Sequence, residues 1–153
     1  IETPGHTPIH ISMLGHGDES HLLCGDTIFN AGVGHCYSGD PNVLYATFRD
    51  KIAPMADNTR IYPGHDYIAN NLNFTLDREP DNADAKALLA EVEGQDPANA
   101  LVTTLGQERK VNTFMRLDNP SVVAGVKAKF PELPDTPSDE DVFLSLRKLR
   151  NDW

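Results

Sequence analysis

Three side chains that can bind metal ions each lie next to a glycine, in segments typical of strand ends. They are His6 in Thr-Pro-Gly-His (3–6), Asp26 in Cys-Gly-Asp (24–26), and His65 in Pro-Gly-His (63–65). Imidazole and carboxylate groups bind zinc, iron or manganese, and one carboxylate can bridge two ions. Loops at strand ends can bring such ligands together. The spacing alone leaves a plainer alternative open, in which Asp26 caps a turn and the histidines are ordinary surface residues.

His10 stands four residues after His6 and offers a further imidazole. The alternation of apolar and polar residues over 9–14 predicts a strand that already contains His10. We therefore expect His10 to hydrogen-bond a ligand or to have a structural role, rather than to bind metal itself.

Several side chains on loops could contact an organic ligand. His35 and Tyr37 lie in segment 31–39, where three glycines predict an irregular loop of the kind that approaches ligands closely. Tyr67 follows the last of the metal-capable residues by two positions. The plainer alternative places Tyr67 in the hydrophobic core.

Arg147 and Arg150 lie three residues apart, on one face of the last predicted helix. Arginine binds carboxylates through a planar fork of N–H donors. The pair could therefore hold an acidic ligand, with a solvated helix face as the alternative.

The composition limits the partners and the cellular compartment that can be expected for this protein. With 153 residues and a formal charge of −10, the chain lacks the basic surface that nucleic acid or an anionic membrane needs. No apolar run of about 18 residues predicts a membrane span, and no signal peptide is visible. Cys24 and Cys36 form neither a CxxC pair nor a disulfide framework, so a reducing cytoplasm is expected. We predict no nucleic-acid and no membrane partner.

The pattern along the chain predicts an α+β protein, with a β-rich part (1–65) before a helical part (66–153). The expected strands are 9–14, 21–24 and 58–62, and the first two form an antiparallel pair around the turn 15–20. Helices are expected at 41–53, 67–79, 84–93, 121–129 and from Ser138 onward, whereas 99–119 is expected to be largely irregular.

The order of the motifs resembles the metallo-β-lactamase superfamily, and within it the hydroxyacylglutathione hydrolase (glyoxalase II) family. Thr-Pro-Gly-His, Cys-Gly-Asp-Thr and Gly-His-Asp-Tyr carry the resemblance to the superfamily. Segments 70–74, 79–82, 103–108 and 112–116 resemble the helical C-terminal part of that family. The resemblance implies the C-terminal half of an αββα sandwich over 1–65, followed by a small helical glutathione-binding domain over 66–153.

The resemblance also implies roles for individual residues. His6 and His65 look like ligands of a first and a second divalent metal, and Asp26 looks like the catalytic carboxylate that bridges them. Residues that contact the glutathione moiety are implied at His35, Tyr37, Tyr67, Arg147 and Arg150. His35 stands where the family usually has Lys or Arg, so a permanent cation is replaced by a weaker base.

The implied activity is hydrolysis of 2-hydroxyacyl glutathione thioesters, such as S-lactoylglutathione, to a hydroxy acid and glutathione. The implied cofactors are two divalent metals, zinc or alternatively iron or manganese. The family's Thr-His-x-His-x-Asp-His motif, which supplies four more ligands, occurs nowhere in this sequence. We therefore expect the chain to hold metal poorly, to be inactive alone, and to be the later part of a longer protein.

Two other classes stay open. One is a non-catalytic remnant, a glutathione-binding or interaction module whose exposed sheet face would favour self-association. The other is a different member of the superfamily, such as a sulfur dioxygenase or a lactonase, which the resemblance over 66–153 disfavours.

Overall fold

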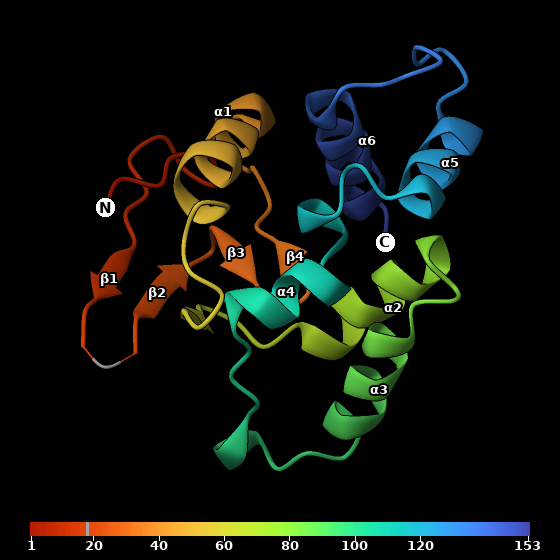
Figure 1. The fold of residues 1–153 in the computed structure, drawn as a ribbon. Coiled ribbons are helices and arrows are strands. Elements are labelled where there is room, and N and C mark those ends of the chain that lie inside the picture. Colours follow the sequence, from red (N-terminus) through yellow and green to blue (C-terminus); the bar gives the residue numbers. More distant parts are fainter. Residues whose placement is uncertain (18) are drawn as a thin grey trace.

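The computed structural model describes residues 1–17 and 19–153, and it is an α+β structure. The five short strands come from the first part of the chain, and most of the helices follow them (Figure 1). Helix α1 (Pro41–Thr47) packs against the last helix, α6 (Asp139–Asn151), so the two parts of the chain are in contact.

Three strands form the larger sheet, in the order β1-β2-β5: β1 (Met13–Gly15), β2 (His21–Gly25) and β5 (Arg60–Pro63). The antiparallel pairing of β1 with β2 confirms the prediction, and β2 pairs with β5 in parallel. The predicted turn at 15–20 contains Asp18, which lies outside the described residues.

Strand β1 starts later than the predicted 9–14 because residues 1–12 pair with one another instead. The N–H of Thr3 donates to the carbonyl of His10, and Glu2 forms an isolated bridge with Ile11. This N-terminal loop places His6 beside the end of the sheet.

A small hairpin of β3 (Ile28–Phe29) and β4 (Gly32–Val33) overlaps the segment 31–39, which was expected to be irregular. That prediction was wrong at its start, because both short strands are buried and pair with each other. Ala31, in the turn between them, has a φ of 57°, in the left-handed region that non-glycine residues seldom adopt.

Helix α1 begins at Pro41, as predicted, and Asp40 caps it, because its carboxylate accepts a hydrogen bond from the backbone N–H of Asn42. It continues as a π-helical turn, Phe48–Ile52. Three apolar residues at four-residue spacing form its buried face: Leu44, Phe48 and Ile52.

Four predicted helices of the second part are confirmed with small shifts of their ends. They are α2 (Ile68–Arg78), α3 (Ala83–Val92), α5 (Pro120–Lys129) and α6. The start of α6 is a capping box in which Ser138 and Asp141 exchange side-chain and backbone hydrogen bonds. A 3-10 turn (Pro97–Asn99) follows α3.

Segment 99–119 is more regular than expected. It contains helix α4 (Leu105–Val111) and a 3-10 turn (Thr113–Met115). The prediction missed α4 because the helix is short, although its start carries a signal: Thr104 and Gln107 form a capping box.

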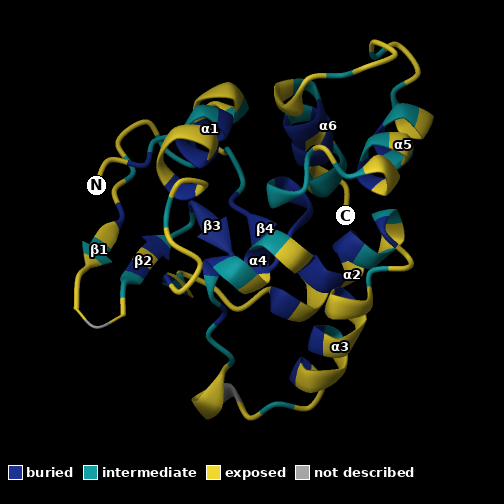
Figure 2. Ribbon diagram, viewed as in Figure 1, coloured by how far each residue is buried: buried dark blue, intermediate teal, exposed yellow. Residues whose placement is uncertain are grey.

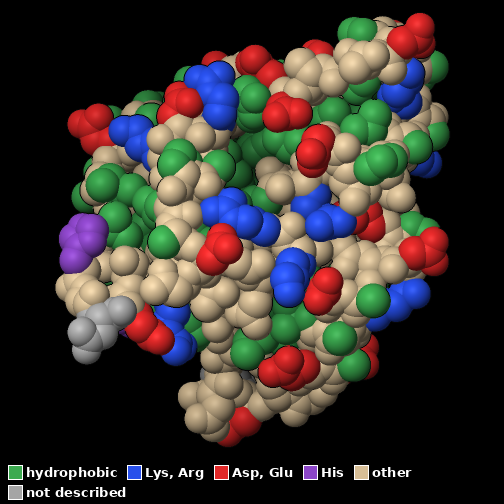
Figure 3. Space-filling model, in the orientation of Figure 1, with side chains coloured by type: hydrophobic (Ala, Val, Ile, Leu, Met, Phe, Trp, Pro, Cys, Tyr) green, Lys and Arg blue, Asp and Glu red, His purple; other side chains and the backbone are tan. Residues whose placement is uncertain are grey.

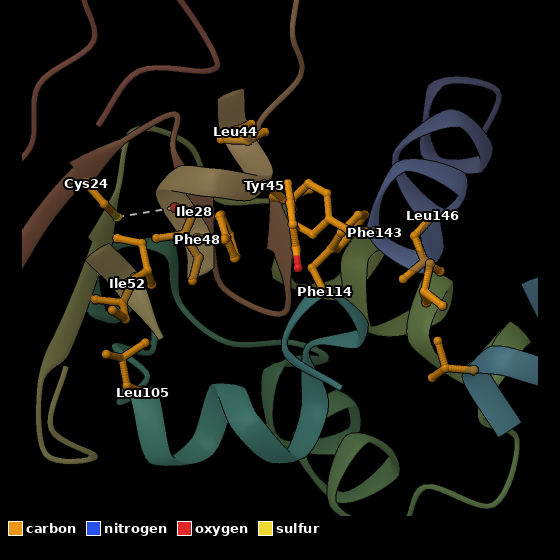
Figure 4. Packing of buried hydrophobic residues seen from close by; sticks show 14 of the residues in the cluster. Cys24, Ile28, Leu44, Tyr45, Phe48, Ile52, Leu105, Phe114, Phe143 and Leu146 are labelled. Atoms are coloured by element: carbon orange, nitrogen blue, oxygen red, sulfur yellow. Dashed lines mark hydrogen bonds between the residues drawn. The ribbon is translucent and has the colours of Figure 1, made fainter. Parts of the chain in front are cut away.

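The main hydrophobic cluster joins both parts of the chain (Figure 4). Phe143 of α6 lies at its centre, with ring centroids 5.3 to 5.4 Å from those of Tyr45, Phe48 and Phe114. A second cluster lies between α2 and α3 and includes Leu72 and Leu88. Because the strands and the last helix share one core, each helps to position the other.

One face of the three-stranded sheet is open to solvent. Met13, Leu23 and Tyr62 are 64%, 46% and 36% exposed. They are neighbours across the strands, because Met13 pairs with Leu23 and Leu23 pairs with Tyr62. Ile11 extends this apolar face, and Figure 2 shows β1 as exposed or intermediate beside the buried positions of β2.

Charged groups are mixed on the face of the molecule drawn in Figure 3, where Lys and Arg side chains stand beside Asp and Glu side chains. No helix within the described part of the chain is long and apolar enough to cross a membrane.

Candidate functional site

The three metal-capable residues predicted from the sequence come together at one end of the sheet. Asp26 follows β2 and His65 follows β5, and the parallel pairing of these strands brings their ends to the same edge. Asp26 Oδ2 lies 3.6 Å from His6 Nε2 and 3.4 Å from His65 Nε2. We call these three residues the histidine–aspartate cluster.

Two glycines let the backbone bring these side chains close. Gly5, which precedes His6, has a φ of 138°, a conformation that favours glycine. Gly64, which precedes His65, packs so closely on Asp26 that a β-carbon at this position would collide with Oδ1. The sterically required glycines at positions 5 and 64 therefore stand directly before His6 and His65.

The imidazole of His6 is held by a backbone carbonyl. Its Nδ1 donates to the carbonyl oxygen of His35, which leaves the lone pair of the neutral ring on Nε2. Nε2 is the atom that faces Asp26. Metal-binding histidines commonly donate their second ring N–H in this way, so His6 is oriented as a ligand would be.

The histidine–aspartate cluster fits divalent metals in kind and spacing. Two ligands on a tetrahedral ion, with bonds of about 2.1 Å, lie roughly 3.4 Å apart, and both His–Asp pairs match this separation. Among residues 1–17 and 19–153, no group of three or more His, Cys, Asp or Glu side chains could hold one ion. Two ions that share Asp26 would therefore each find two ligands in the cluster, whereas zinc sites use three or four.

His10 has the structural role that the sequence favours. Its Nδ1 lies 2.9 Å from the hydroxyl oxygens of both Thr3 and Thr27. Burial, and then the nearby His6 imidazole, lower the pKa of His10. Its ring packs edge-on against that of His6, at a centroid distance of 5.8 Å.

A cavity of about 240 Å³ adjoins the histidine–aspartate cluster, and we call it the α6 cavity. The hairpin, the loop that follows it and the last helix form its walls. All five residues that the sequence assigns to ligand contact lie together there, with four others. The lining residues are Phe29, Val33, His35, Tyr37, Tyr67, Arg147, Arg150, Asn151 and Trp153.

Arg147 is only 4% exposed, so the alternative of a solvated helix face is wrong for it. Its Nη1 donates to the carbonyls of Val33 and Gly34, and its Nη2 donates to Asn151 Oδ1 at 2.8 Å. Burial lowers the pKa of Arg147 to about 10, which still leaves the guanidinium charged at neutral pH. Its buried Nε–H finds no hydrogen-bond partner in the described structure.

Arg150 is half-buried, and burial lowers its pKa. Its Nη2 donates to Asn71 Oδ1 at 3.1 Å. The ring of His35 stacks on that of Tyr37, with centroids 3.9 Å apart. Burial, and then the charge of Arg147, lower the pKa of His35, so this imidazole is neutral at pH 7. The positive charge of the α6 cavity therefore comes from its two arginines.

Tyr67 links the α6 cavity to the histidine–aspartate cluster. Its ring stacks on His65 and meets Phe29 edge-on, with centroid distances of 5.3 Å for both. It is 46% exposed, so the alternative that placed it in the core is wrong.

Phe29, Asn151 and Trp153 also line the α6 cavity, and the sequence analysis missed them. No motif singles them out, although Trp153 is the only tryptophan in the chain. It meets Phe74 edge-on at 5.5 Å, which brings the end of the chain to this cavity.

The two cysteines are free thiols and neither is activated. Burial raises the pKa of Cys24 to about 12, and its S–H donates to the carbonyl of Ile28. Burial also raises the pKa of Cys36. Thiolate nucleophiles need the opposite shift, so a nucleophilic cysteine does not fit this site.

Comparisons with known proteins agree with the geometry. A family model described as "Hydroxyacylglutathione hydrolase C-terminus" matches residues 66–153. Hydroxyacylglutathione hydrolases of Nitrosococcus oceani and Polaromonas sp. (strain JS666) are 56% and 54% identical over 100% of this chain. The chain spans 59% of the length of each of these relatives.

A solved metallo-beta-lactamase from Staphylococcus aureus matches with a TM-score of 0.51 at 20% identity, covering 97% of this chain and 37% of that one. The chain therefore has part of the metallo-β-lactamase fold. Because the family model covers residues 66–153, more than half of the sequence, the chain belongs to the hydroxyacylglutathione hydrolase family.

Proposed function

We propose that this chain supplies the glutathione-binding part, and part of a two-metal site, of an enzyme that hydrolyses 2-hydroxyacyl glutathione thioesters. The substrates would be thioesters such as S-lactoylglutathione, and the products a hydroxy acid and glutathione. One observation carries the proposal: a cavity with two arginines adjoins a cluster of metal-capable side chains. Longer relatives named hydroxyacylglutathione hydrolase support it.

The α6 cavity suits an acidic tripeptide. Glutathione carries two carboxylates, and the guanidinium groups of Arg147 and Arg150 are the two cations among the lining residues that can attract them. The hydroxyls of Tyr37 and Tyr67 offer further hydrogen bonds beside an apolar wall. Because His35 is neutral at pH 7, it contributes a hydrogen bond rather than a charge.

We propose His6, Asp26 and His65 as metal ligands, with Asp26 shared between two divalent ions and zinc preferred over iron or manganese. Ions of this kind supply, when bound, an activated water and a Lewis acid for the thioester carbonyl. The chain's own part is to orient the two imidazoles and to keep one carboxylate between them. The leaving thiolate has a pKa of about 8.5, so no strong general acid is required.

We further propose that 1–65 is the metal-binding part and 66–153 a helical glutathione-binding domain. The family model, which begins at residue 66, supports this boundary. A cytoplasmic location is supported by the two free cysteines, which suit a reducing compartment.

The metal content of the purified 153-residue chain tests the metal part. We expect well below one metal per chain by elemental mass spectrometry, because each ion would find only two ligands. A content close to two metals per chain would contradict this expectation, and would mean that a second molecule supplies the remaining ligands.

Binding of a non-hydrolysable S-methyl glutathione tests the α6 cavity. Trp153 lines the cavity, so its fluorescence should change on binding in a saturable way. Arg150→Ala should weaken binding by about tenfold or more, because it removes a charged donor. Arg49→Ala is the matched control, since Arg49 is exposed and pairs with Asp50 outside the cavity. A wild-type chain that shows no saturable change would contradict the proposed function.

The open sheet face favours a second candidate, a non-catalytic glutathione-binding or interaction module that associates with itself. Exposed apolar patches of this kind mark protein contacts. Under this candidate the chain elutes larger than a monomer, and Leu23→Lys shifts it toward the monomer because Leu23 is central on that face. A wild-type monomer that binds no hydrophobic dye rules this candidate out.

A further inference from the structure

Glu108, on α4, is a carboxylate with no exposed surface and no ion-pair partner among the described residues. Three neutral donors surround it. Its Oε2 accepts from the Ala31 N–H at 2.8 Å and from Asn112 Nδ2 at 2.9 Å, and its Oε1 accepts from the Thr103 hydroxyl at 2.6 Å. A buried charge without a cation is costly, and burial raises the pKa of Glu108 to about 7. The cost of burying this carboxylate raises the question of what it does in the folded chain.

The bonds around Glu108 hold the turn between β3 and β4, residues 30–32. Ala31 donates to the carboxylate itself, while Asn30 Nδ2 donates to Thr103 Oγ1 at 2.7 Å. Asn112 Nδ2 also donates to the carbonyl of Gly32 at 3.0 Å. Each residue of the 30–32 turn is thus bonded to the segment around α4. The left-handed conformation of Ala31 requires this kind of support.

The 30–32 turn is connected to the α6 cavity by two routes. Phe29 and Val33, on either side of the turn, line the cavity directly. Asn71 forms the second route, because its Nδ2 donates to the Asn30 carbonyl at 2.9 Å and its Oδ1 accepts from Arg150 Nη2 at 3.1 Å. A shift of the turn would therefore move an aromatic wall and a cation of the cavity together.

We propose that Glu108 is a positioning residue, whose ionised carboxylate holds the 30–32 turn and thereby sets the places of Phe29 and Arg150 in the α6 cavity. The inference rests on the proposed function, in which this cavity receives the glutathione moiety. It extends that function to a residue that touches neither the substrate cavity nor the metal-capable side chains.

Burial disfavours the charge on Glu108, but the three hydrogen-bond donors around it match the ionised form. A protonated carboxyl carries a hydrogen that needs an acceptor, and neither the Ala31 N–H nor the NH2 group of Asn112 can accept it. The Thr103 hydroxyl already accepts from Asn30. Thr103 could accept a second hydrogen bond, from a protonated Glu108, only if its own hydrogen left the carboxylate. Protonation of Glu108 therefore leaves one polar hydrogen without an acceptor or displaces one donor. It also weakens the bonds that hold the 30–32 turn, because a neutral carboxyl is a poorer acceptor than a carboxylate.

Other titratable groups near Glu108 do not replace it. From β2, the Cys24 thiol faces it, and that thiol stays neutral because its pKa is about 12. On α4 itself, Arg109 donates to Asp57 and to backbone carbonyls. Beyond the 3-10 turn that follows, Arg116 pairs with Glu79. The carboxylate thus titrates without a neighbouring cation.

Binding of S-methyl glutathione between pH 5.5 and 7.5 tests the inference, with Trp153 fluorescence as the readout. The ligand's carboxylates and amine titrate outside this range, at about 3.5 and 8, and its sulfur carries no proton. We expect wild-type affinity to fall several-fold toward pH 5.5. Glu108→Gln should bind several-fold more weakly at pH 7.5 and should lose this pH dependence.

Two matched variants isolate the effect. Glu91→Gln makes the same change of charge at an exposed position of α3, and it should keep the wild-type curve. His35→Gln removes the imidazole of the cavity, and its binding should still weaken toward pH 5.5. Wild-type binding that is independent of pH, or a Glu108→Gln curve that matches the wild type, would overturn the inference while leaving the proposed function intact.

The backbone amide signals of Ala31 and Gly32 provide a readout that needs no glutathione. In the wild type they should shift with pH through a single midpoint near 7, and in Glu108→Gln they should not. If the chain binds no glutathione thioether but this titration is seen, the proposed function fails while Glu108 still holds the turn. If the signals do not respond to Glu108, the inference fails whatever the chain binds.

If Glu108→Gln does not fold, Thr103→Val provides a second test of the role of Glu108. This near-isosteric change removes one donor to the ionised carboxylate, so the midpoint of the Ala31 titration and of binding should both move to higher pH. An unchanged midpoint would contradict the assignment.

Discussion

The histidine–aspartate cluster and the α6 cavity differ in how many of the groups that each site needs are present in the described chain. In the cluster, three side chains meet at one carboxylate oxygen, and the His65 side chain is 53% exposed. In the cavity, the Arg147 guanidinium and the 30–32 turn are buried and bonded from several elements. The cavity therefore has its supporting contacts within the described chain, whereas each His–Asp pair of the cluster has no further metal-capable side chain placed to hold the same ion among residues 1–17 and 19–153. Binding of the organic ligand should be more robust than binding of metal.

Phe143→Ala should have the largest effect on stability of all the variants proposed. It tests whether the two regions share one core. Removal of this buried ring should cost about 3–5 kcal/mol of unfolding free energy. Urea unfolding, followed by Trp153 fluorescence and by far-ultraviolet circular dichroism, measures it. Phe130→Ala, at the partly buried edge of the cluster, is the milder control. Separate transitions for the two probes would show that the regions are independent.

The pH dependence of stability tests the polar network beside the α6 cavity. The pKa of Glu108 is about 7 in the folded chain, above its usual value of 4.5. Its contribution to stability is therefore fully present below about pH 4.5 and is lost as the pH rises through about 7. Relative to Glu108→Gln, the wild type should lose about 2–3 kcal/mol over this range, at about 1.4 kcal/mol per pKa unit. Urea titrations at each pH measure this difference.

Stability and binding should thus respond to pH in opposite directions. A merely structural role for Glu108 would move both the same way, so parallel changes in unfolding free energy and in affinity would contradict the positioning role.

Arg147→Lys tests the completeness of the α6 cavity. The three donors of a lysine ammonium lie on one nitrogen, so they cannot reproduce the fork in which Nη1 bonds the loop carbonyls and Nη2 bonds Asn151. The loop after β4 therefore loosens. Affinity for S-methyl glutathione should fall about thirtyfold, or about 2 kcal/mol. Calorimetry measures it, and Arg49→Lys at the exposed surface serves as the control. An unchanged affinity would mean that the arginine fork is dispensable.

Asp26→Asn tests the histidine–aspartate cluster in the same way. Loss of the shared negative charge should weaken zinc binding about tenfold from an already low affinity, since a neutral amide is a poor zinc ligand. Glutathione binding should stay within about twofold, because Asp26 does not line the α6 cavity. Parallel loss of both activities would show that the two regions are not separable.

His35→Lys should have the smallest effect. It puts a permanent cation where the wild type has a neutral imidazole, so affinity for S-methyl glutathione should rise a few-fold, or about 0.5–1 kcal/mol at pH 7.5. The gain should shrink in high salt because the site is partly open. Weaker binding would indicate that the stacking of His35 on Tyr37 matters more than charge.

Local signals predicted most of the secondary structure correctly. Asp40 with Pro41, and Ser138 with Asp141, are start signals that depend on neighbouring residues alone, and the helices begin there. Segment 99–119 was misjudged because α4 is short and its Thr104–Gln107 capping box stands outside a long apolar pattern. Strand β1 was placed too early because residues 1–12 pair among themselves, which alternation of apolar and polar residues does not reveal.

The amino-acid sequence by itself determined the kind of chemistry that the candidate site can support. The residue types and glycine spacing around His6, Asp26 and His65 indicate side chains that can bind metal, and the order of the motifs resembles that of the family to which the chain belongs. Only the tertiary structure decided how the other groups act, because their roles depend on burial and on partners distant in the sequence. Burial changed Arg147 from a surface cation into a support for a loop, and it left Glu108 as a lone carboxylate beneath the 30–32 turn. Neither effect has a local signature, since both arise from packing between elements that the chain brings together only when it folds.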